Sequence, residues 1–303
     1  MHCSETQPDI ENVYWYFKYH RAVDSQRQPM FKRLIMSYTS GLEDPDLPYY
    51  EDWYSLLADY AVCQMTKPSD KLVAISAVAK EMQKHLSDVG EPTTYLAGLW
   101  GSRLPQALIW YIEPSSVQRS RPRSFRAPSW SWAAVDGQLI HRDETFDFES
   151  PFARVVRAET TTSTGDETGQ VTGGSITLES VLLLLTARFG ASTGHSASSC
   201  LDIASIKASG ENHAPVRFGS DSDADASGNV YFDTLEDVGY EVQFMPVTRQ
   251  AGSDHFTYGL ALVGHGEVFK RVGHVVINLH WEEMLPSWNT WLRELPRHVI
   301  DIE

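Results

Sequence analysis

Apolar residues recur every three or four positions through much of the first 112 residues, which is the period of one face of an α-helix. The clearest repeat runs from Leu72 to Leu86, after an N-cap at residues 68–69 and before the helix breakers Gly90 and Pro92. The same period predicts helices over residues 10–17, 31–38, 49–60 and 95–112. Together these segments predict a helical bundle.

The pattern changes after Gly137, where β-branched and aromatic residues gather in short runs bounded by Gly, Asn and Asp. Strands are predicted over residues 152–156, 176–187, 230–233, 240–247, 258–263, 268–277 and 298–302. The expected fold class is therefore α+β, with an N-terminal helical bundle packed on a C-terminal antiparallel β-barrel or sandwich.

The same change divides the chain into a helical region, 1–122, and a β-rich region, 123–303, which we expect to form one integrated globular unit. Two low-complexity insertions interrupt the β-rich region. Residues 159–174 are rich in Thr and Gly, and residues 190–229 are rich in Ser, Gly, Ala and Asp, apart from an apolar island at 201–206. Loops of this length and composition are flexible or act as lids, and we expect mobile surface loops here.

The stretch from Arg126 to Gly137 carries two tryptophans one residue apart. Because side chains alternate along a strand, Trp130 and Trp132 would lie on one face of an extended segment. Pro128 fixes the start of this segment, and Asp136–Gly137 ends it with a turn. We therefore expect a strand that delivers two indoles to one core or one pocket.

Residues 126–137 resemble the tryptophan-rich signature of the fungal heterokaryon-incompatibility (HET) family. Further motifs stand ahead of it in the order and approximate spacing of that family, at Trp53, Tyr60 and Thr66 and at residues 70–79, 95–100 and 108–110. The resemblance is strongest over residues 53–137 and weaker to residue 303. Residues 1–50 do not match the N-terminal part of a HET domain, which is likened to Toll/interleukin-receptor folds. The resemblance therefore does not carry over the death-inducing activity of the family intact.

The composition narrows the range of partners. The chain of 303 residues has a formal net charge of −15, which argues against a nucleic-acid partner because such binding depends on basic residues. The longest apolar run, residues 181–185, is too short to span a membrane, and the N-terminus lacks the pattern of a secretion signal. Cys3, Cys63 and Cys200 have neither disulfide nor zinc-site spacing. We expect a soluble cytoplasmic protein.

Motifs for nucleotide, redox or metal chemistry are absent from the sequence. The acidic run at Asp221, Asp223 and Asp225 resembles the start of a calcium loop, but Ala226 and Phe232 replace its glycine and its bidentate glutamate. The histidines at 265, 274 and 280 show no metal-ligand spacing. We therefore expect no cofactor and no metal.

The aromatic side chains are the remaining candidates for a binding site. A cleft between helices and sheet would bind a small hydrophobic substrate, and the candidates for its walls are Trp130, Trp132, Tyr95, Trp100, Trp110, Tyr16 and His20. The catalytic polar contact would come from Arg126, Asp136 or His141. The alternative is that these aromatics are core residues and that Asp136 is a turn residue bonded to nearby backbone.

Two functions follow from these features. In the first, a HET relative has been recruited as a cofactor-independent enzyme of fungal secondary metabolism, a cyclase or isomerase such as a pericyclic (4+2) cyclase, or a dehydratase. In the second, the chain is a non-catalytic interaction or regulatory module in non-self recognition, binding through an aromatic patch. A closed pocket lined by the tryptophans favours the enzyme, and a flat exposed patch favours the module. A homo-oligomer is compatible with both.

Overall fold

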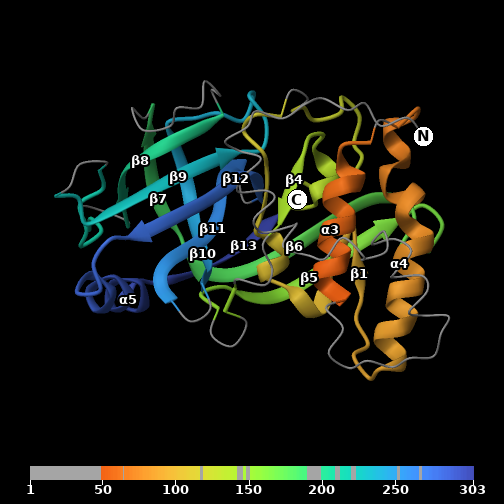
Figure 1. Ribbon diagram of the computed structural model, residues 1–303, viewed down its shortest axis with the longest axis horizontal. Helices are drawn as coiled ribbons and strands as arrows, with labels where there is room; N and C mark the ends of the chain where they lie inside the picture. The colour runs from red at the N-terminus through yellow and green to blue at the C-terminus, as the bar shows by residue number, and fades with distance from the viewer. Residues whose placement is uncertain are drawn as a thin grey trace, which may run out of the picture.

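The computed structural model describes residues 49–63, 65–116, 119–141, 146–147, 151–189, 199–208, 212–219, 223–250, 253–265 and 268–303. The helices predicted over residues 10–17 and 31–38, and the candidates Tyr16 and His20, lie outside these residues. Two α-helices stand side by side at one end of the molecule, and the strands occupy the rest (Figure 1).

The helix predictions at 49–60 and 72–86 are confirmed. Helix α3 is Tyr49–Ala61, and α4, Lys71–Asp88, follows the short 3-10 helix Pro68–Asp70. The stripe predicted for α4 is buried, at Leu72, Ile75, Ala79, Met82 and Leu86. No helix within the described ranges is both long enough and apolar enough for a membrane span.

The helix predicted over 95–112 is wrong, so the N-terminal side is not a clear helical bundle. Strands β1 (Tyr95–Leu96) and β2 (Leu99–Trp100) form a tight antiparallel hairpin there. Its two turn residues, Ala97 and Gly98, have φ of 48° and 100°, which favours a two-residue hairpin turn and excludes a right-handed helix. Two 3-10 helices, Gly101–Arg103 and Gln106–Leu108, and strand β3, Trp110–Ile112, follow.

The C-terminal part contains a closed barrel of six antiparallel strands, so the barrel alternative of the prediction is confirmed (Figure 1). Around the barrel the order is β11, β10, β7, β8, β9 and β12, and β12 pairs back with β11. The strands are β7 Leu183–Arg188, β8 Cys200–Lys207, β9 Ala226–Phe232, β10 Glu241–Gln250, β11 Ser253–His265 and β12 Val268–Leu279. Helix α5, Met284–Glu294, adds Trp288 and Leu292 to the barrel's apolar core.

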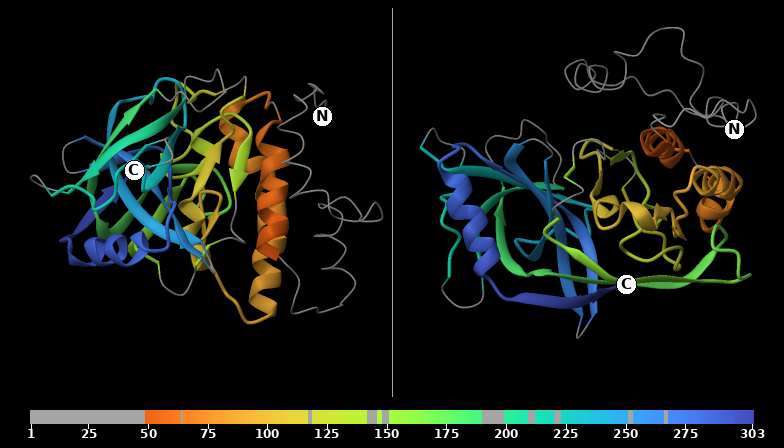
Figure 2. Two further views of the ribbon diagram at one scale, coloured as in Figure 1. Left: turned by 60° about the vertical axis from the view of Figure 1, so that its left-hand side comes forward. Right: turned by 90° about the horizontal axis from the view of Figure 1, so that it is seen from below.

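Three strands extend the sheet beyond the barrel, and two of them, drawn in green, continue beneath the two N-terminal helices in the right-hand view of Figure 2. Strand β13, Arg297–Ile302, pairs in parallel with the start of β12 and antiparallel with β6, Val171–Val181. Strand β5, Arg154–Thr162, pairs with the other side of β6. A small sheet of β3 and β4, Leu139–His141, lies in the same half of the molecule.

The two segments expected as insertion loops contain strands. Residues 159–174 comprise the end of β5, a turn and the start of β6. Within the second segment, residues 190–229, strand β8 includes the apolar island at 201–206, and strand β9 begins at Ala226. Gly174 in the first segment serves close packing, since a Cβ there would lie 2.9 Å from Cγ of Pro128.

Residues 126–137 do not form the predicted strand. They form a turn followed by the 3-10 helix Trp132–Ala134, whose N-cap Ser131 accepts a hydrogen bond from the Ala133 N–H. The two indoles nevertheless reach one core, because both belong to the apolar cluster between the helices, the strand extension and the outer wall of the barrel.

Candidate functional site

The aromatic candidates of the described chain are core residues. Tyr95, Trp100, Trp110, Trp130 and Trp132 are at most 1% exposed. Trp132 Nε1 donates to Gly98 O at 3.0 Å, and Trp110 Nε1 donates to Trp130 O at 3.1 Å. These bonds fasten residues 95–100, 108–110 and 126–137 to one another, which is a structural role.

Arg126 and Asp136 belong to a charge cluster with Lys71. The Asp136 carboxylate lies 2.8 Å from Arg126 Nη2 and 3.2 Å from Lys71 Nζ, and Lys71 also donates to Val135 O at 2.7 Å. Burial lowers the pKa of Lys71 to about 8. Burial raises the pKa of Asp136, but the charge of Lys71 and the hydrogen bond from Arg126 outweigh it, so the net shift is downward. The cluster joins the start of α4 to residues 126–136.

His141 stacks on Tyr54, with ring centroids 3.6 Å apart and planes 7° apart. Burial lowers the pKa of His141 to about 3, so the imidazole is neutral near pH 7. Its ring lies 6.3 Å from that of Phe146, but His141 lines neither the aromatic cavity beside β3 nor the groove beside the start of β5. The geometry makes His141 a packing residue.

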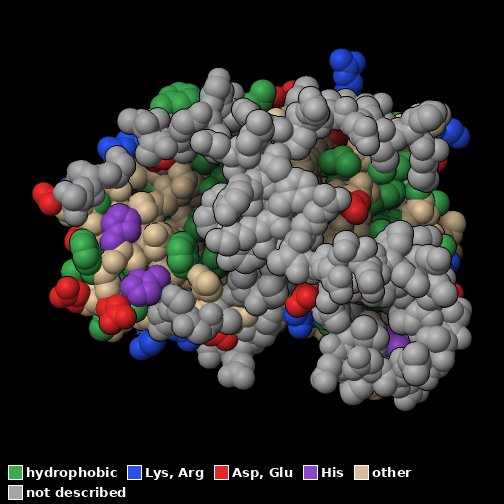
Figure 3. Space-filling model, viewed as in Figure 1, with side chains coloured by type: hydrophobic (Ala, Val, Ile, Leu, Met, Phe, Trp, Pro, Cys, Tyr) green, Lys and Arg blue, Asp and Glu red, His purple; other side chains and the backbone are tan. Residues whose placement is uncertain are grey.

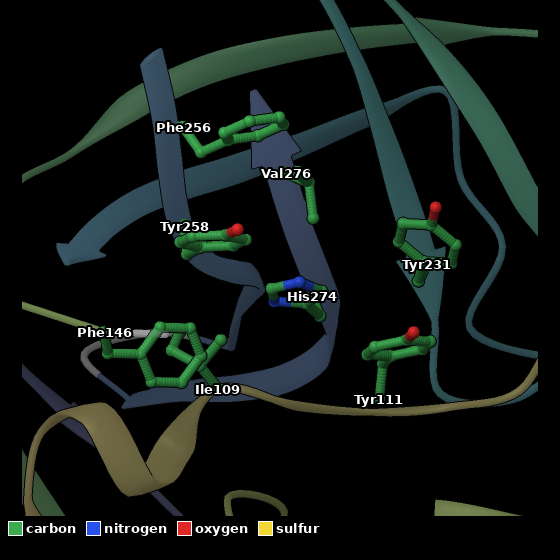
Figure 4. Close-up of a pocket in the computed structure, with 8 residues that line it drawn as sticks. All are labelled: Ile109, Tyr111, Phe146, Tyr231, Phe256, Tyr258, His274 and Val276. Atoms are coloured by element: carbon green, nitrogen blue, oxygen red, sulfur yellow. The ribbon is translucent and has the colours of Figure 1, made fainter. Parts of the chain in front are cut away.

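A cavity of about 120 Å³ lies between the outer wall of the barrel and β3 (Figure 4). Its lining is aromatic and aliphatic, and comprises Ile109, Tyr111, Phe146, Tyr231, Phe256, Tyr258, His274 and Val276. We call it the His274 pocket.

Strand alternation builds the barrel side of the His274 pocket. Tyr258 of β11 stands opposite Val276 of β12, and His274 of β12 stands opposite Tyr231 of β9. These side chains therefore share one face of three neighbouring strands, while Val275 and Ile277 point to the other face and join the barrel core. Strand β3 supplies Tyr111 from across the cavity (Figure 4).

His274 lies at the centre of nearly parallel rings. Its centroid is 5.5 Å from that of Tyr111, 6.0 Å from Tyr258 and 6.1 Å from Tyr231, with interplanar angles of 14°, 13° and 26°. Phe146 closes one side, at 62° to the plane of Tyr258. A flat ligand that lies parallel to these rings gains the most contact.

The lining offers hydrogen-bonding groups but no ions. The lining residues include three tyrosines and one histidine, and none of them is Lys, Arg, Asp or Glu. His274 is 2% exposed, so the imidazole acts in a desolvated setting. Across the described part of the chain, no group of three or more His, Cys, Asp or Glu could hold a metal ion.

Arg271 holds β3 against the barrel behind the pocket. Its guanidinium lies 3.2 Å from the ring centroid of Trp110, and Nη2 donates to Trp110 O at 2.5 Å. Burial lowers the pKa of Arg271 to about 10, with Asp233 at 3.3 Å supporting the charged form. Ile109 and Tyr111, which line the pocket, are the sequence neighbours of Trp110. By holding Trp110, Arg271 therefore positions both of these residues.

The sequence prediction missed all eight residues of the His274 pocket. The available signal was alternation, with aromatic residues at 256 and 258 and a polar ring at 274 two positions before Val276. Comparisons with models of known families, with curated proteins and with solved structures find no match to this chain.

Proposed function

We propose that this protein is a cofactor-independent isomerase or cyclase that acts on a small planar conjugated ring in the His274 pocket. One observation carries the proposal: a buried imidazole stands among three tyrosine rings that lie within 26° of its plane. Because residues 53–137 resemble the fungal HET family, we further propose that the enzyme acts in fungal secondary metabolism.

The size of the pocket sets the size of the substrate. A cavity of about 150 Å³ binds one benzene, so a cavity of about 120 Å³ encloses at most one small ring, and any remainder of a larger molecule lies outside it. A lining without ions disfavours a charged group inside the pocket, because a buried charge needs a partner. We therefore propose an uncharged conjugated carbonyl compound as the substrate.

Proton transfer is the chemistry that the lining supports. In its neutral form, the imidazole of His274 would take a proton from the carbon next to the conjugated system, while a tyrosine hydroxyl donates a hydrogen bond to the carbonyl oxygen. The resulting dienolate would regain the proton from the imidazolium at a different carbon. The product is an isomer of equal mass, and no oxidant or cofactor is consumed.

Deuterium exchange tests this proposal. Cyclohex-2-enone in D₂O should exchange its protons at the carbon beyond the double bond faster with the protein than in buffer. His274→Asn should lower this rate by at least about 100-fold, the usual contribution of a general base, while His298→Asn on β13 should leave it unchanged. Exchange at the buffer rate, or equal rates for wild type and His274→Asn, would refute the proposal.

A different feature supports the second candidate function, an interaction module in non-self recognition. Phe189 and Tyr240 are 63% and 55% exposed and form an edge-on pair 5.8 Å apart. Exposed aromatic pairs are common at interface hot spots. A strain that lacks the gene would separate the two functions: loss of one metabolite with build-up of its isomer favours the enzyme, and altered strain compatibility with unchanged metabolites favours the module.

A further inference from the structure

We infer that two copies of this chain associate edge to edge through β5. The order of the nine-stranded sheet ends at β5, and among the described strands only β6 pairs with it. The outward backbone N–H and C=O groups of such an edge can bond to another strand. This surface is separate from the His274 pocket.

The edge is regular over its central part. Between two register shifts, β5 pairs evenly with β6 from Arg157 to Thr161. Ala158 packs against the core, whereas the side chains of Arg157 and Glu159 are 60% and 58% exposed and lie 3.7 Å apart as an ion pair on the other face of the strand. The open edge therefore has one apolar face and one charged face, as a strand inside a sheet does.

The charges on β5 are complementary to those of a second β5. When identical strands pair antiparallel, a two-fold axis passes through the centre of the pairing. With the axis at Ala158, Arg157 of each copy stands opposite Glu159 of the other, and opposed side chains are about 5 Å apart at Cβ. An axis at Arg157 or at Glu159 would place like charges face to face. Among these three registers, the charge pattern favours the axis at Ala158.

The negative net charge of the chain determines the salt concentration at which association should be measured. Two molecules of formal charge −15 repel each other, but the Debye length of about 8 Å at 0.15 M salt confines this repulsion to short range. The contact charges on β5 are closer than this length and retain their complementarity. Association is therefore best measured at 0.15 M salt.

Sedimentation equilibrium with charge-reversal variants tests the inference. At about 100 μM protein we expect twice the chain mass of 34.1 kDa. Arg157→Glu or Glu159→Arg, each of which opposes like charges twice, should raise the dimer dissociation constant at least about tenfold. The double variant should restore the wild-type value, and the surface control Glu282→Arg should not change it. A wild-type monomer, unaffected single variants or an unrestored double variant would each overturn the inference.

A cross-link tests the register separately. Across the axis the two Ala158 Cα atoms would be about 4.5–5.5 Å apart, within the range of a disulfide. Under mild oxidation Ala158→Cys should form a covalent dimer, whereas Thr160→Cys, displaced from the axis, should not exceed wild type. Equal cross-linking of both variants, or none in Ala158→Cys, would overturn the assigned register.

Discussion

Two histidines near the barrel wall differ in what surrounds them. His274 stands among tyrosine rings that line a cavity, while His141 is sealed in the core against Tyr54. From the sequence, His141 is a candidate for the catalytic polar contact, and His274 is noted only as a histidine without metal-ligand spacing. The difference arises from side chains far apart in the chain, which only the tertiary structure brings together.

His141 makes the fold sensitive to acid. Its folded pKa of about 3 lies below the ordinary value of 6.5, so the unfolded chain takes up the proton first. The stability that this neutral ring contributes is present above pH 6.5 and is lost as the pH falls toward 3. Relative to His141→Phe, wild type should lose about 2 kcal/mol of unfolding free energy between pH 7 and pH 5.

Urea titrations of both proteins at these two pH values measure this difference. Phe keeps an aromatic ring against Tyr54, so the comparison isolates the proton. Parallel losses in wild type and His141→Phe would show that His141 does not set the acid response.

At the scale of elements, the hairpin of β1 and β2 shows why local pattern misled the prediction. Tyr95, Leu96, Leu99 and Trp100 have the spacing of a helix face, but all six residues from 95 to 100 are buried. Burial on every side fits a short hairpin enclosed by the core as well as a helix. The deciding feature is the turn at Ala97–Gly98, which pattern analysis does not weigh.

Gly98 should be one of the least replaceable residues of this hairpin. A Cβ there would lie 2.3 Å from Trp132 Nε1, and its φ of +100° strains any other residue. Gly90 has a φ of +84° with nothing within 4 Å of a Cβ, so Gly90→Ala measures the backbone cost alone. We expect about 1 kcal/mol for Gly90→Ala and at least about 2 kcal/mol more for Gly98→Ala.

Thermal and urea unfolding of the two glycine variants provide the comparison. Equal costs would mean that the core around Trp132 adapts to the extra methyl group, and that the hairpin is less tightly fixed than its contacts indicate.

The barrel strands were easier to predict than the N-terminal elements. Runs such as residues 258–263 and 268–277 combine β-branched residues with flanking turn residues, and their strands formed as expected. Strand β8 escaped prediction because its apolar residues sit within a Ser- and Gly-rich segment. Low complexity around a strand hides it from composition, although its alternating burial is that of an ordinary barrel strand.

At the scale of the whole molecule, the candidate site depends on strand pairing. The pocket needs β9, β12 and β11 side by side and β3 laid across them, and Arg271 fixes that approach through Trp110. Helix and strand periods contain no information on which strands become neighbours. The sequence therefore predicts an aromatic-lined cleft between helices and sheet. The tryptophans predicted to line it are instead core residues that hold these two layers together.

Outside the pocket, the surface of the molecule carries a mixture of charged and apolar side chains. Figure 3 shows acidic, basic and apolar side chains interspersed on the visible face, alongside residues that are not described. The described side chains on this face form no extended basic region, and the net charge of the whole chain is negative. The pocket and the β5 edge are separate surfaces, so binding and association can be tested separately.

Calorimetric titration of a single-ring carbonyl compound into wild type and a pocket-filling variant tests the central claim most directly. Wild type should bind cyclohex-2-enone with a negative heat-capacity change, because apolar surface is buried. Val276→Trp should weaken binding at least about tenfold by filling the cavity, whereas Val299→Trp, at an exposed position of β13, should bind as wild type does. Equal binding by all three proteins, or none by wild type, would contradict the assignment of the His274 pocket as the ligand site.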